Sequence, residues 1–437
     1  MMDGVITSER QNYAFPAIIG EKINSYYEAE IFNQAEINSN LGLNYFTNER
    51  RGHFELFYRN PGDEFPARRA LNGEFPGDWS GDSGLIRNFS FPGLQISEKT
   101  IPSGEVDNLY LDRIQIPDRM SVLDYIIDKN PAVVLVVTGY EDLLPFVLNG
   151  ATGTANETAL DSKNSEINAT PVSKFTENIQ VIVEQLQNQA EASIILATVP
   201  NPLRSPYFNT LRFNMEMGRE LSTAEIGQLN NFYENFNSQV FDYNYSDTVS
   251  VEDRRPFIDF DVNGGAKLKA RVIIDPSLPT VKLDDGSELP KIRQMAENEY
   301  LSFRAEQTLY DDAYGKTTPI RPEDVLTEAD IEKVNEVLTG YNTAIRDLAA
   351  SSAMIHLLDV ERIISDVTEG RIEVGGVFYN SEFTRESIYS SDGLFLNPKG
   401  NALIARFLSE HLNQNFDVSL LPVNVNSYPG LQVAQDF

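Results

Sequence analysis

Residues 131–139 read PAVVLVVTG, and this stretch decides the fold class. It is a run of mostly β-branched apolar residues without polar alternation, and a glycine closes it. Such a run is typical of a parallel strand that is buried on both faces of its sheet. The run SIILATVPNP at residues 193–202 repeats this pattern, and MIHLLDV at 354–360 gives a third candidate strand.

Helical patterns separate these candidate strands. Apolar residues recur at helical spacing over residues 172–190, and further helices are predicted over 13–23, 121–128 and 398–413. Strands that alternate with helices of such lengths indicate βαβ units and a mostly parallel sheet, so we expect an α/β fold. Residues 50–90 are rich in Gly, Pro, Asn and Arg, which predicts a long surface loop.

We expect one domain over residues 1–437, with an irregular insertion region at 205–320. The alternation of strands and helices fits residues 243–320 poorly, because they are rich in Asp, Pro and Gly and leave room for one hairpin. Ser222 and Glu225 have the spacing of a capping box, which predicts a helix that begins inside this region.

Two segments of the chain resemble one another over about twenty residues. They are ELSTAEIGQLNNFYENFNSQV at 220–240 and VLTEADIEKVNEVLTGYNTAI at 325–345, in which Asn237 matches Asn342. The similarity indicates either a local repeat or two helices under the same packing demands. We favour the second interpretation, because a single pair is a weak sign of a repeat architecture.

The composition excludes several classes of function. The 35 Lys and Arg residues against 65 Asp and Glu residues give a net charge of −30, which argues against nucleic-acid binding and against adhesion to anionic lipid. The chain has no cysteine, which excludes disulfides, a cysteine nucleophile, thiolate zinc sites and iron–sulfur clusters. No apolar run is long enough to span a bilayer, and the first eleven residues lack the features of a signal peptide.

In a parallel α/β sheet, ligands bind at the carboxyl ends of the strands. The loops of interest are therefore residues 138–144, residues 199–203 and the loop that leads into the C-terminal helix. Six segments of the chain are informative in their order. They are SERQNYAFPAIIGEKI (8–23), NFSFPGLQISE (88–98), VVLVVTGYEDLL (133–144), KTTPIRPEDVLTEADIEKVNEVLTGYN (316–342), SSDGLFLNPKGNALIARFL (390–408) and LLPVNVNSYPG (420–430).

In this order the segments resemble the SGNH/GDSL hydrolases, and specifically the large bacteroidetal branch of GDSL-like lipases/acylhydrolases. The resemblance implies a three-layer α/β/α, flavodoxin-like fold with a parallel sheet and large loop insertions. It also implies ester hydrolysis by a serine that a histidine activates and an aspartate orients. Backbone N–H groups and an asparagine side chain would hold the oxyanion.

The resemblance places the serine block immediately before Asp3 and Gly4, where the printed sequence begins. The family's first strand and its nucleophile are therefore expected to be missing from this chain. A Gly-Asp-Ser sequence does occur at residues 81–83, but it follows a turn-rich stretch and no strand, so we interpret it as a surface loop. Gly93 matches the glycine of the oxyanion hole, although a tight turn would need a glycine there equally.

The remaining family positions are mostly substituted. Glu141 occupies the position of the oxyanion asparagine, and an ionised carboxylate would repel an oxyanion. Asp392 matches the aspartate of the triad, but Phe395 stands where the histidine belongs, and phenylalanine has no proton chemistry. Glu141 and Asp392 are expected at the same sheet edge, where they would form an acid/base pair, hold a cation, or remain in a relic pocket.

The chain has three histidines, and none is a convincing substitute for the missing base. His356 falls inside a predicted strand, where a core role is expected. His411 falls on the C-terminal helix, with its solvated face as the expected location, and His53 follows two arginines in the predicted loop. No pair has the spacing of a metal site, and we expect neither a metal nor a cofactor.

A missing first strand would leave two strands with unpaired edges across a gap. Residues upstream of Met1, a rearranged sheet or a strand from another chain would each solve this problem.

Three functions then remain: a catalytically inactive binding protein, an active serine esterase whose serine lies upstream of Met1, and a structural or partner-docking protein. Acyl or glycan esters are the ligands that the resemblance implies, and an envelope protein is a possible partner. The resemblance places the protein in the periplasm or at the outer membrane.

Overall fold

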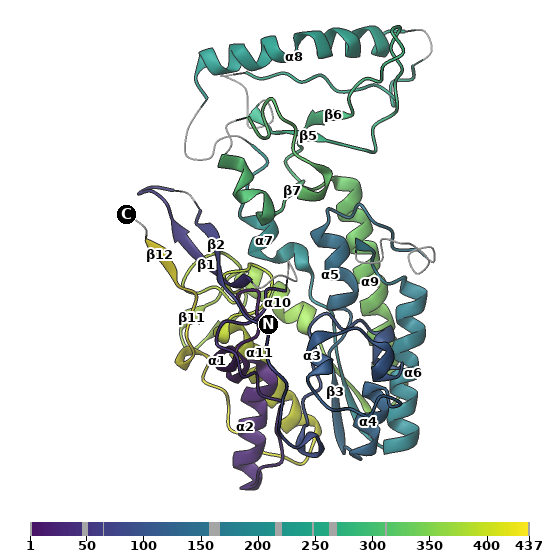
Figure 1. Cartoon of the computed structure of the whole chain (residues 1–437), viewed down its shortest axis with the longest axis vertical. Coiled ribbons are helices and arrows are strands. Elements are labelled where there is room, and N and C mark those ends of the chain that lie inside the picture. The colour runs from purple at the N-terminus through teal and green to yellow at the C-terminus, as the bar shows by residue number, and fades with distance from the viewer. Residues whose placement is uncertain are drawn as a thin grey trace.

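A parallel sheet of three strands lies in the lower half of Figure 1, in the order β3 (Val133–Val136), β4 (Ser193–Ala197) and β9 (Ile355–Leu358). The computed structural model describes residues 2–45, 51–63, 65–156, 167–214, 221–246, 249–261, 269–310 and 313–435. Within these ranges the chain is a mixture of helices with small parallel and antiparallel sheets, as expected for an α/β protein.

The helices are α1 (Ser8–Asn12), α2 (Phe15–Tyr27), α3 (Leu109–Asp112), α4 (Val122–Asp128), α5 (Tyr140–Leu148), α6 (Val172–Ala190), α7 (Pro206–Asn209), α8 (Thr223–Asn244), α9 (Glu328–Ser351), α10 (Val360–Thr368) and α11 (Pro398–Asn415). The other strands are β1 (Arg51–Tyr58), β2 (Ala67–Asn72), β5 (Val272–Ile274), β6 (Ile292–Gln294), β7 (Tyr300–Leu301), β8 (Val325–Leu326), β10 (Glu373–Val374), β11 (Val377–Phe378) and β12 (Val433–Gln435).

The middle strand, β4, is buried on both faces as its sequence predicts. Ile194 and Leu196 face one apolar cluster and Ile195 faces another, and each side chain is at most 1% exposed. The same prediction is wrong for the ends of the run at β3, where Val133 is 40% exposed and Val137 49% exposed. The reason is that β3 is an edge strand, which pairs with β4 alone among the described strands.

Helices cover both faces of this sheet. On one face, α6 and α9 contribute the apolar side chains of the largest cluster, because their buried residues recur at helical spacing. On the other face, α2, α10 and α11 pack together in a second cluster. Within the described ranges, none of the helices combines the length and the apolar character needed to cross a bilayer.

The predicted long loop at residues 50–90 is wrong in its first half. Residues 51–72 form the antiparallel pair of β1 and β2, and β12 near the end of the chain adds to β1 in parallel (Figure 1). Leu56 of β1 is fully buried, although Gly, Arg and Asn are frequent around it. The local composition could not reveal this sheet, because its third strand lies more than 370 residues away in the sequence.

The insertion region carries more regular structure than its composition predicts. Helix α8, which begins with the predicted capping box of Ser222 and Glu225, lies across the top of the molecule in Figure 1. Strands β5 and β6 pair antiparallel beneath it, which confirms the expected hairpin. The lobe has its own apolar cluster, whose members fall between residues 221 and 292.

Three asparagines on α8 replace the backbone partners that a strand would provide. They lie seven residues apart, and each side-chain amide accepts from the backbone N–H and donates to the backbone C=O of one residue in the extended segment 255–260. The pairs are Asn230 with Phe260, Asn237 with Ile258, and Asn244 with Arg255, at 2.7–2.9 Å. The segment is thereby held against the helix without a sheet.

The matched residues of the two similar segments play the same part. Asn237 binds both backbone groups of Ile258, and Asn342 of α9 binds both backbone groups of Val199 after β4. Ile258 is fully buried and Val199 is 2% exposed, so neither pair of groups has access to water. This shared role supports the interpretation that the two helices are similar because each packs against a buried backbone segment that needs hydrogen-bond partners.

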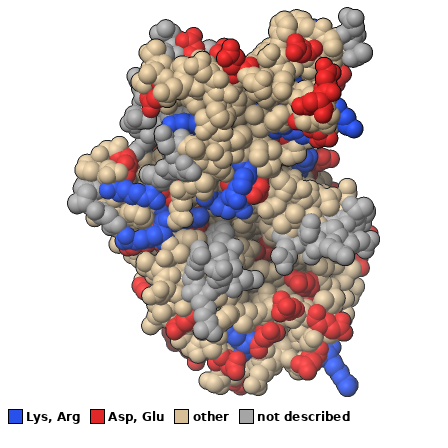
Figure 2. All heavy atoms as spheres, turned by 45° about the horizontal axis from the view of Figure 1, so that its top comes forward, with Lys and Arg blue, Asp and Glu red and all other residues tan. Residues whose placement is uncertain are grey.

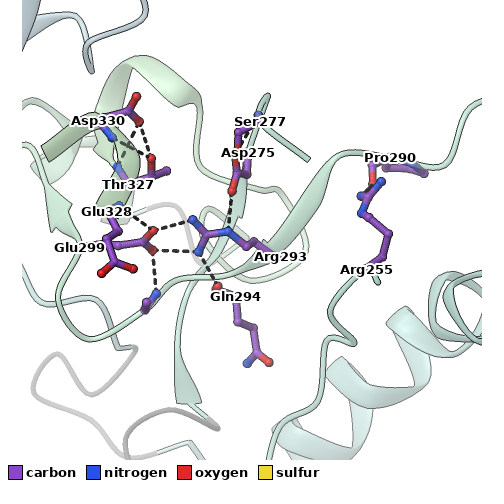
Figure 3. Close-up of polar contacts among 11 residues, drawn as sticks. Arg255, Asp275, Ser277, Pro290, Arg293, Gln294, Glu299, Thr327, Glu328 and Asp330 are labelled. Atoms are coloured by element: carbon purple, nitrogen blue, oxygen red, sulfur yellow. Dashed lines mark hydrogen bonds and ion pairs between the residues drawn. The ribbon is translucent and has the colours of Figure 1, made fainter. Parts of the chain in front are cut away.

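A half-buried arginine with two buried carboxylate partners ties the insertion lobe to the start of α9 (Figure 3). Arg293 on β6 donates to Asp275 at 2.6 Å and, through both terminal nitrogens, to Glu299 at 2.9 and 2.5 Å. Glu299 also accepts from the backbone N–H of Glu328, in the first turn of α9. Burial opposes ionisation of Asp275, but the hydrogen bonds from Ser277 and Arg293 outweigh it and hold its pKa below the usual value.

We expect Arg293→Met to lower the free energy of unfolding by about 3–5 kcal/mol, because it leaves Asp275 and Glu299 as buried carboxylates without their cation. Urea denaturation at neutral pH measures the loss. Lys282→Met, which removes an exposed charge from the same lobe, is the control and should cost far less. A loss in Arg293→Met no larger than in the control would contradict the buried role of this cluster.

Candidate functional site

Loops from four distant parts of the chain meet at the carboxyl end of β3. Helix α5 begins at Tyr140, directly after the strand, and its N-cap Gly139 has the left-handed backbone conformation that favours glycine (φ 97°). The hydroxyl of Tyr140 donates to the backbone C=O of Leu394 at 3.2 Å, which joins α5 to the loop before α11. The predicted convergence of these two loops is therefore present.

Glu141 lies in the first turn of α5 and binds two donors from other loops. The hydroxyl of Tyr45 donates to its carboxylate, and so does the backbone N–H of Gly93. Burial raises the pKa of Glu141, and these two hydrogen bonds oppose the rise. Glu141 and Gly93 are thus brought together, with the carboxylate as the acceptor of the glycine N–H.

Gly93 has φ 76°, so its position requires a residue that tolerates the left-handed region. Among the described atoms, a Cβ at this position would meet only the side-chain nitrogen of Asn108, at 3.8 Å. Space is therefore no obstacle to a larger residue, and the backbone conformation explains the glycine. The left-handed backbone conformation of Gly93 is the one that a tight turn requires. Its N–H also lies beside the carboxylate of Glu141.

Asp392 is fully buried, and its two oxygens accept from its own loop and from the N-terminal segment. One oxygen accepts from the backbone N–H groups of Leu394 and Phe395 at 2.7 and 2.8 Å. The other accepts from the hydroxyl of Ser390 at 2.7 Å and from the N–H of Gly4 at 2.6 Å. Burial raises the pKa of Asp392 in spite of these donors. The residue shapes a turn, and it orients no imidazole.

Phe395 lies between two tyrosines. Its ring packs edge-to-face against Tyr45 at a centroid distance of 5.4 Å and against Tyr140 at 6.0 Å. Because Tyr45 binds Glu141 and the N–H of Phe395 binds Asp392, the aromatic ring connects the two carboxylates without bringing them into contact. The four predicted positions therefore share one edge of the sheet, and aromatic side chains fill the space between them.

Tyr45 and Asp3 are the members of this site that sequence reasoning missed. Tyr45 follows no motif and comes from an irregular segment, so only its contacts reveal it. Asp3 accepts from the N–H and the hydroxyl of Ser391 at 2.9 and 2.7 Å and pairs with Arg10 at 2.8 Å. The resemblance places the serine block directly before Asp3, which was the one available signal for its location.

One of the three histidines lies beside this site and the other two pair with each other. His53 precedes Phe54, whose N–H donates to the backbone C=O of Asp3 at 2.8 Å. Burial and the charge of Arg10 lower the pKa of His53, and the charge of Asp3 opposes that change. His356 of β9 packs edge-to-face against His411 of α11, with ring centroids 5.8 Å apart, so the expected solvated location of His411 is wrong. Burial and the neighbouring His356 lower the pKa of His411, and its buried Nε2 has no hydrogen-bond partner. His53 lies on β1, and its buried Nδ1 is likewise without a hydrogen-bond partner.

The Gly-Asp-Ser sequence at residues 81–83 lies on the surface. Asp82 is exposed and caps a single turn of 3₁₀ helix by accepting from the N–H of Gly84 at 2.8 Å. The preceding strand, β2, ends at Asn72, so no strand leads directly into the motif and it lacks the strand–turn–helix context of a nucleophile. Among the described residues, no group of three or more histidine or acidic side chains is arranged to hold a metal ion.

Charge is unevenly distributed on the surface. Figure 2 shows acidic side chains over the lower front of the molecule and at its upper edge, with Lys and Arg gathered in a band across the middle of that face.

Comparison of the chain with models of protein families, with curated proteins and with solved structures gave no match. The functional argument therefore depends on the residues of the site themselves.

We expect Tyr45→Phe to lower the free energy of unfolding by about 1.5–3 kcal/mol, the range for a hydrogen bond to a charged group. The variant leaves the buried Glu141 carboxylate with one donor fewer. Urea denaturation at pH 7.5 or so measures the change. Tyr26→Phe, at a tyrosine 43% exposed, is the matched control and should be nearly neutral. Equal losses in both variants would show that Glu141 does not depend on Tyr45.

The histidine pair predicts a dependence of stability on pH. The pKa of His411 in the folded state lies below its value of about 6.5 in the unfolded chain, so the unfolded state binds more protons as the pH falls through that range. The contribution of His411 to stability is therefore complete above pH 7 or so and declines towards about pH 5.

Urea denaturation of the wild type and of His411→Gln across this range isolates the effect. We expect the wild type to exceed the variant in free energy of unfolding by an amount that shrinks as the pH falls. The difference should be constant above pH 8 or so, where His411 is neutral in both the folded and the unfolded state. A difference that is constant from about pH 8 to pH 5 would contradict the lowered pKa of His411.

Proposed function

We propose that this chain is a non-catalytic member of the SGNH/GDSL hydrolase fold, with a binding role at a bacterial cell envelope. The observation that carries the proposal is the position of Glu141, whose carboxylate accepts from the hydroxyl of Tyr45 and lies beside the backbone N–H of Gly93. In a working hydrolase of this kind, such an N–H would be available for the oxyanion of the reaction. Here a side-chain carboxyl group lies beside it.

The arrangement of the sheet is consistent with the proposed fold. Three parallel strands with helices on both faces suit a three-layer α/β/α, flavodoxin-like core, and the candidate site lies at the carboxyl end of its strands. The insertion lobe around α8 and the β1–β2–β12 sheet correspond to the large additions that the resemblance implies.

The chemistry of the site argues against ester hydrolysis by these residues. Removal of one oxyanion donor costs roughly 10²–10³ in rate, and a carboxylate at that position adds repulsion. Phe395 cannot accept a proton, and Asp392 spends its oxygens on backbone N–H groups and on Ser390. Among the described residues, neither carboxylate is hydrogen-bonded to a histidine.

The free edge of β3 favours a second candidate, an active serine esterase whose nucleophile strand lies upstream of Met1. Val133 and Val137 are half exposed on this strand, and no described strand pairs with its outer edge. Gly4 already binds Asp392, so a strand that led into Asp3 would end beside the candidate site. The proposed binding role and this alternative differ in one measurable property, which is turnover.

Incubation of the purified chain with p-nitrophenyl acetate and p-nitrophenyl butyrate decides between them. We expect no release of p-nitrophenol above that of a Glu141→Gln, Asp392→Asn control, because the proposed function does not use the two carboxylates in catalysis. Turnover that a serine-directed fluorophosphonate abolishes would overturn the proposal and support the esterase. The same assay on a chain extended upstream by its genomic sequence tests the second candidate directly.

A further inference from the structure

A cavity with a volume of about 440 Å³ lies at the start of α11. It is formed by the side chains of Arg385, Lys399 and Asn426 and by the C-terminal segment 428–432. It shares no residue with the candidate site at Gly93, Glu141, Asp392 and Phe395. Its volume lies in the range of cavities that bind small molecules.

Lys399 is the unusual member of this cavity. The residue is only 9% exposed, yet its ammonium makes no hydrogen bond and no ion pair with any described residue. Its charge faces the ring of Tyr379, with Nζ 5.8 Å from the centroid. An ammonium carries three donors. The side chain of Lys399 is packed along its length, but Nζ is not among the described nitrogen atoms that are both buried and unpartnered, so the ammonium is open to the cavity with its donors unused by the protein.

The rest of the cavity adds positive charge and offers no carboxylate. The side chain of Arg385 is exposed and forms no ion pair among the described residues. Lys399 also lies in the first turn of α11, an 18-residue helix whose amino end is electropositive. Glu21 and Glu386 lie close enough to influence Tyr428 and Tyr379, but neither forms an ion pair with the two cations.

The remaining polar side chain holds the wall in place. Asn426 donates to the backbone C=O groups of Val374 and Gly375 at 3.4 and 3.3 Å, and it accepts from the hydroxyl of Tyr379. The ring on which Lys399 lies is thereby fixed from the opposite side. Gly430 allows the C-terminal segment to approach closely, since a Cβ there would lie 2.5 Å from the backbone oxygen of Arg385 and 3.2 Å from Nζ of Lys399.

We propose that this cavity binds the oxyanion group of a small molecule, such as a phosphate, sulfate or carboxylate, with the Lys399 ammonium and the Arg385 guanidinium as the two cations that line it. A guanidinium suits such a group because its planar donors match two oxygens at once. In a chain with 65 acidic and 35 basic residues, two neighbouring cations without a carboxylate partner form an arrangement that an anionic ligand completes. The volume exceeds that of a bare ion, so the ligand carries a further moiety.

Isothermal titration of the full chain with inorganic phosphate, sulfate and acetate, at constant ionic strength, tests this site. We expect saturable binding of at least one anion, and the rank of the three separates phosphate and sulfate ligands from carboxylate ligands. Lys399→Gln should weaken that binding by about tenfold or more, which is the scale of one charge-assisted hydrogen bond. Arg119→Gln removes an exposed charge from the loop before α4 and should leave the affinity unchanged.

Two further variants keep the test decisive if Lys399→Gln folds poorly. Arg385→Gln changes an exposed side chain and should weaken the same anion without loss of thermal stability. Gly430→Ala would place a Cβ 2.5 Å from the backbone oxygen of Arg385, so it should displace this wall of the cavity and weaken binding of the anion while all charges remain. Failure of all three anions to bind saturably, or equal affinity in Arg385→Gln and Arg119→Gln, would overturn the proposal.

Discussion

Buried backbone groups that no strand pairs must find side-chain partners, and much of this structure depends on that constraint. The amides of Asn230, Asn237 and Asn244 hold an extended segment against α8 that would otherwise have no partner. Asn342 does the same for Val199 at the end of β4, and Asp392 collects the N–H groups of its own turn. Long irregular segments are stable here because polar side chains replace the missing ladders.

The sequence predicted those parts of the fold whose signal is local. The apolar runs at β3, β4 and β9 and the helical spacing of α6 mark the central layers, because each element shows its periodicity within its own residues. The β1–β2–β12 sheet escaped prediction because its pairing joins the two ends of the chain. The exposure of β3 escaped it too, since an apolar run looks alike at the centre and at the edge of a sheet.

The location of the candidate site could be predicted from the sequence, but the contacts among its side chains could be predicted only in part. Parallel strands bring their carboxyl ends together, so Glu141, Asp392 and Phe395 could be assigned to one edge from the order of the elements. The role of Glu141 as a hydrogen-bond acceptor could not be predicted, because it depends on Tyr45, a residue of an irregular segment. Likewise, Lys399 reads in the sequence as an ordinary helix-start lysine, and only its burial against Tyr379 and Gly430 distinguishes it.

The substitutions at positions 141 and 395 are physically consistent with one another. A backbone N–H such as that of Gly93 is useful to a reaction only while a base supplies an attacking nucleophile. Under the proposed function Phe395 stands in the place of a base, so the N–H of Gly93 would have no transient oxyanion to bind. The Glu141 carboxylate lies beside that N–H, Tyr45 donates to the same carboxylate, and the ring of Phe395 packs on Tyr45. In that case these donors would contribute to the stability of the fold, as the two carboxylates and the aromatic ring do together.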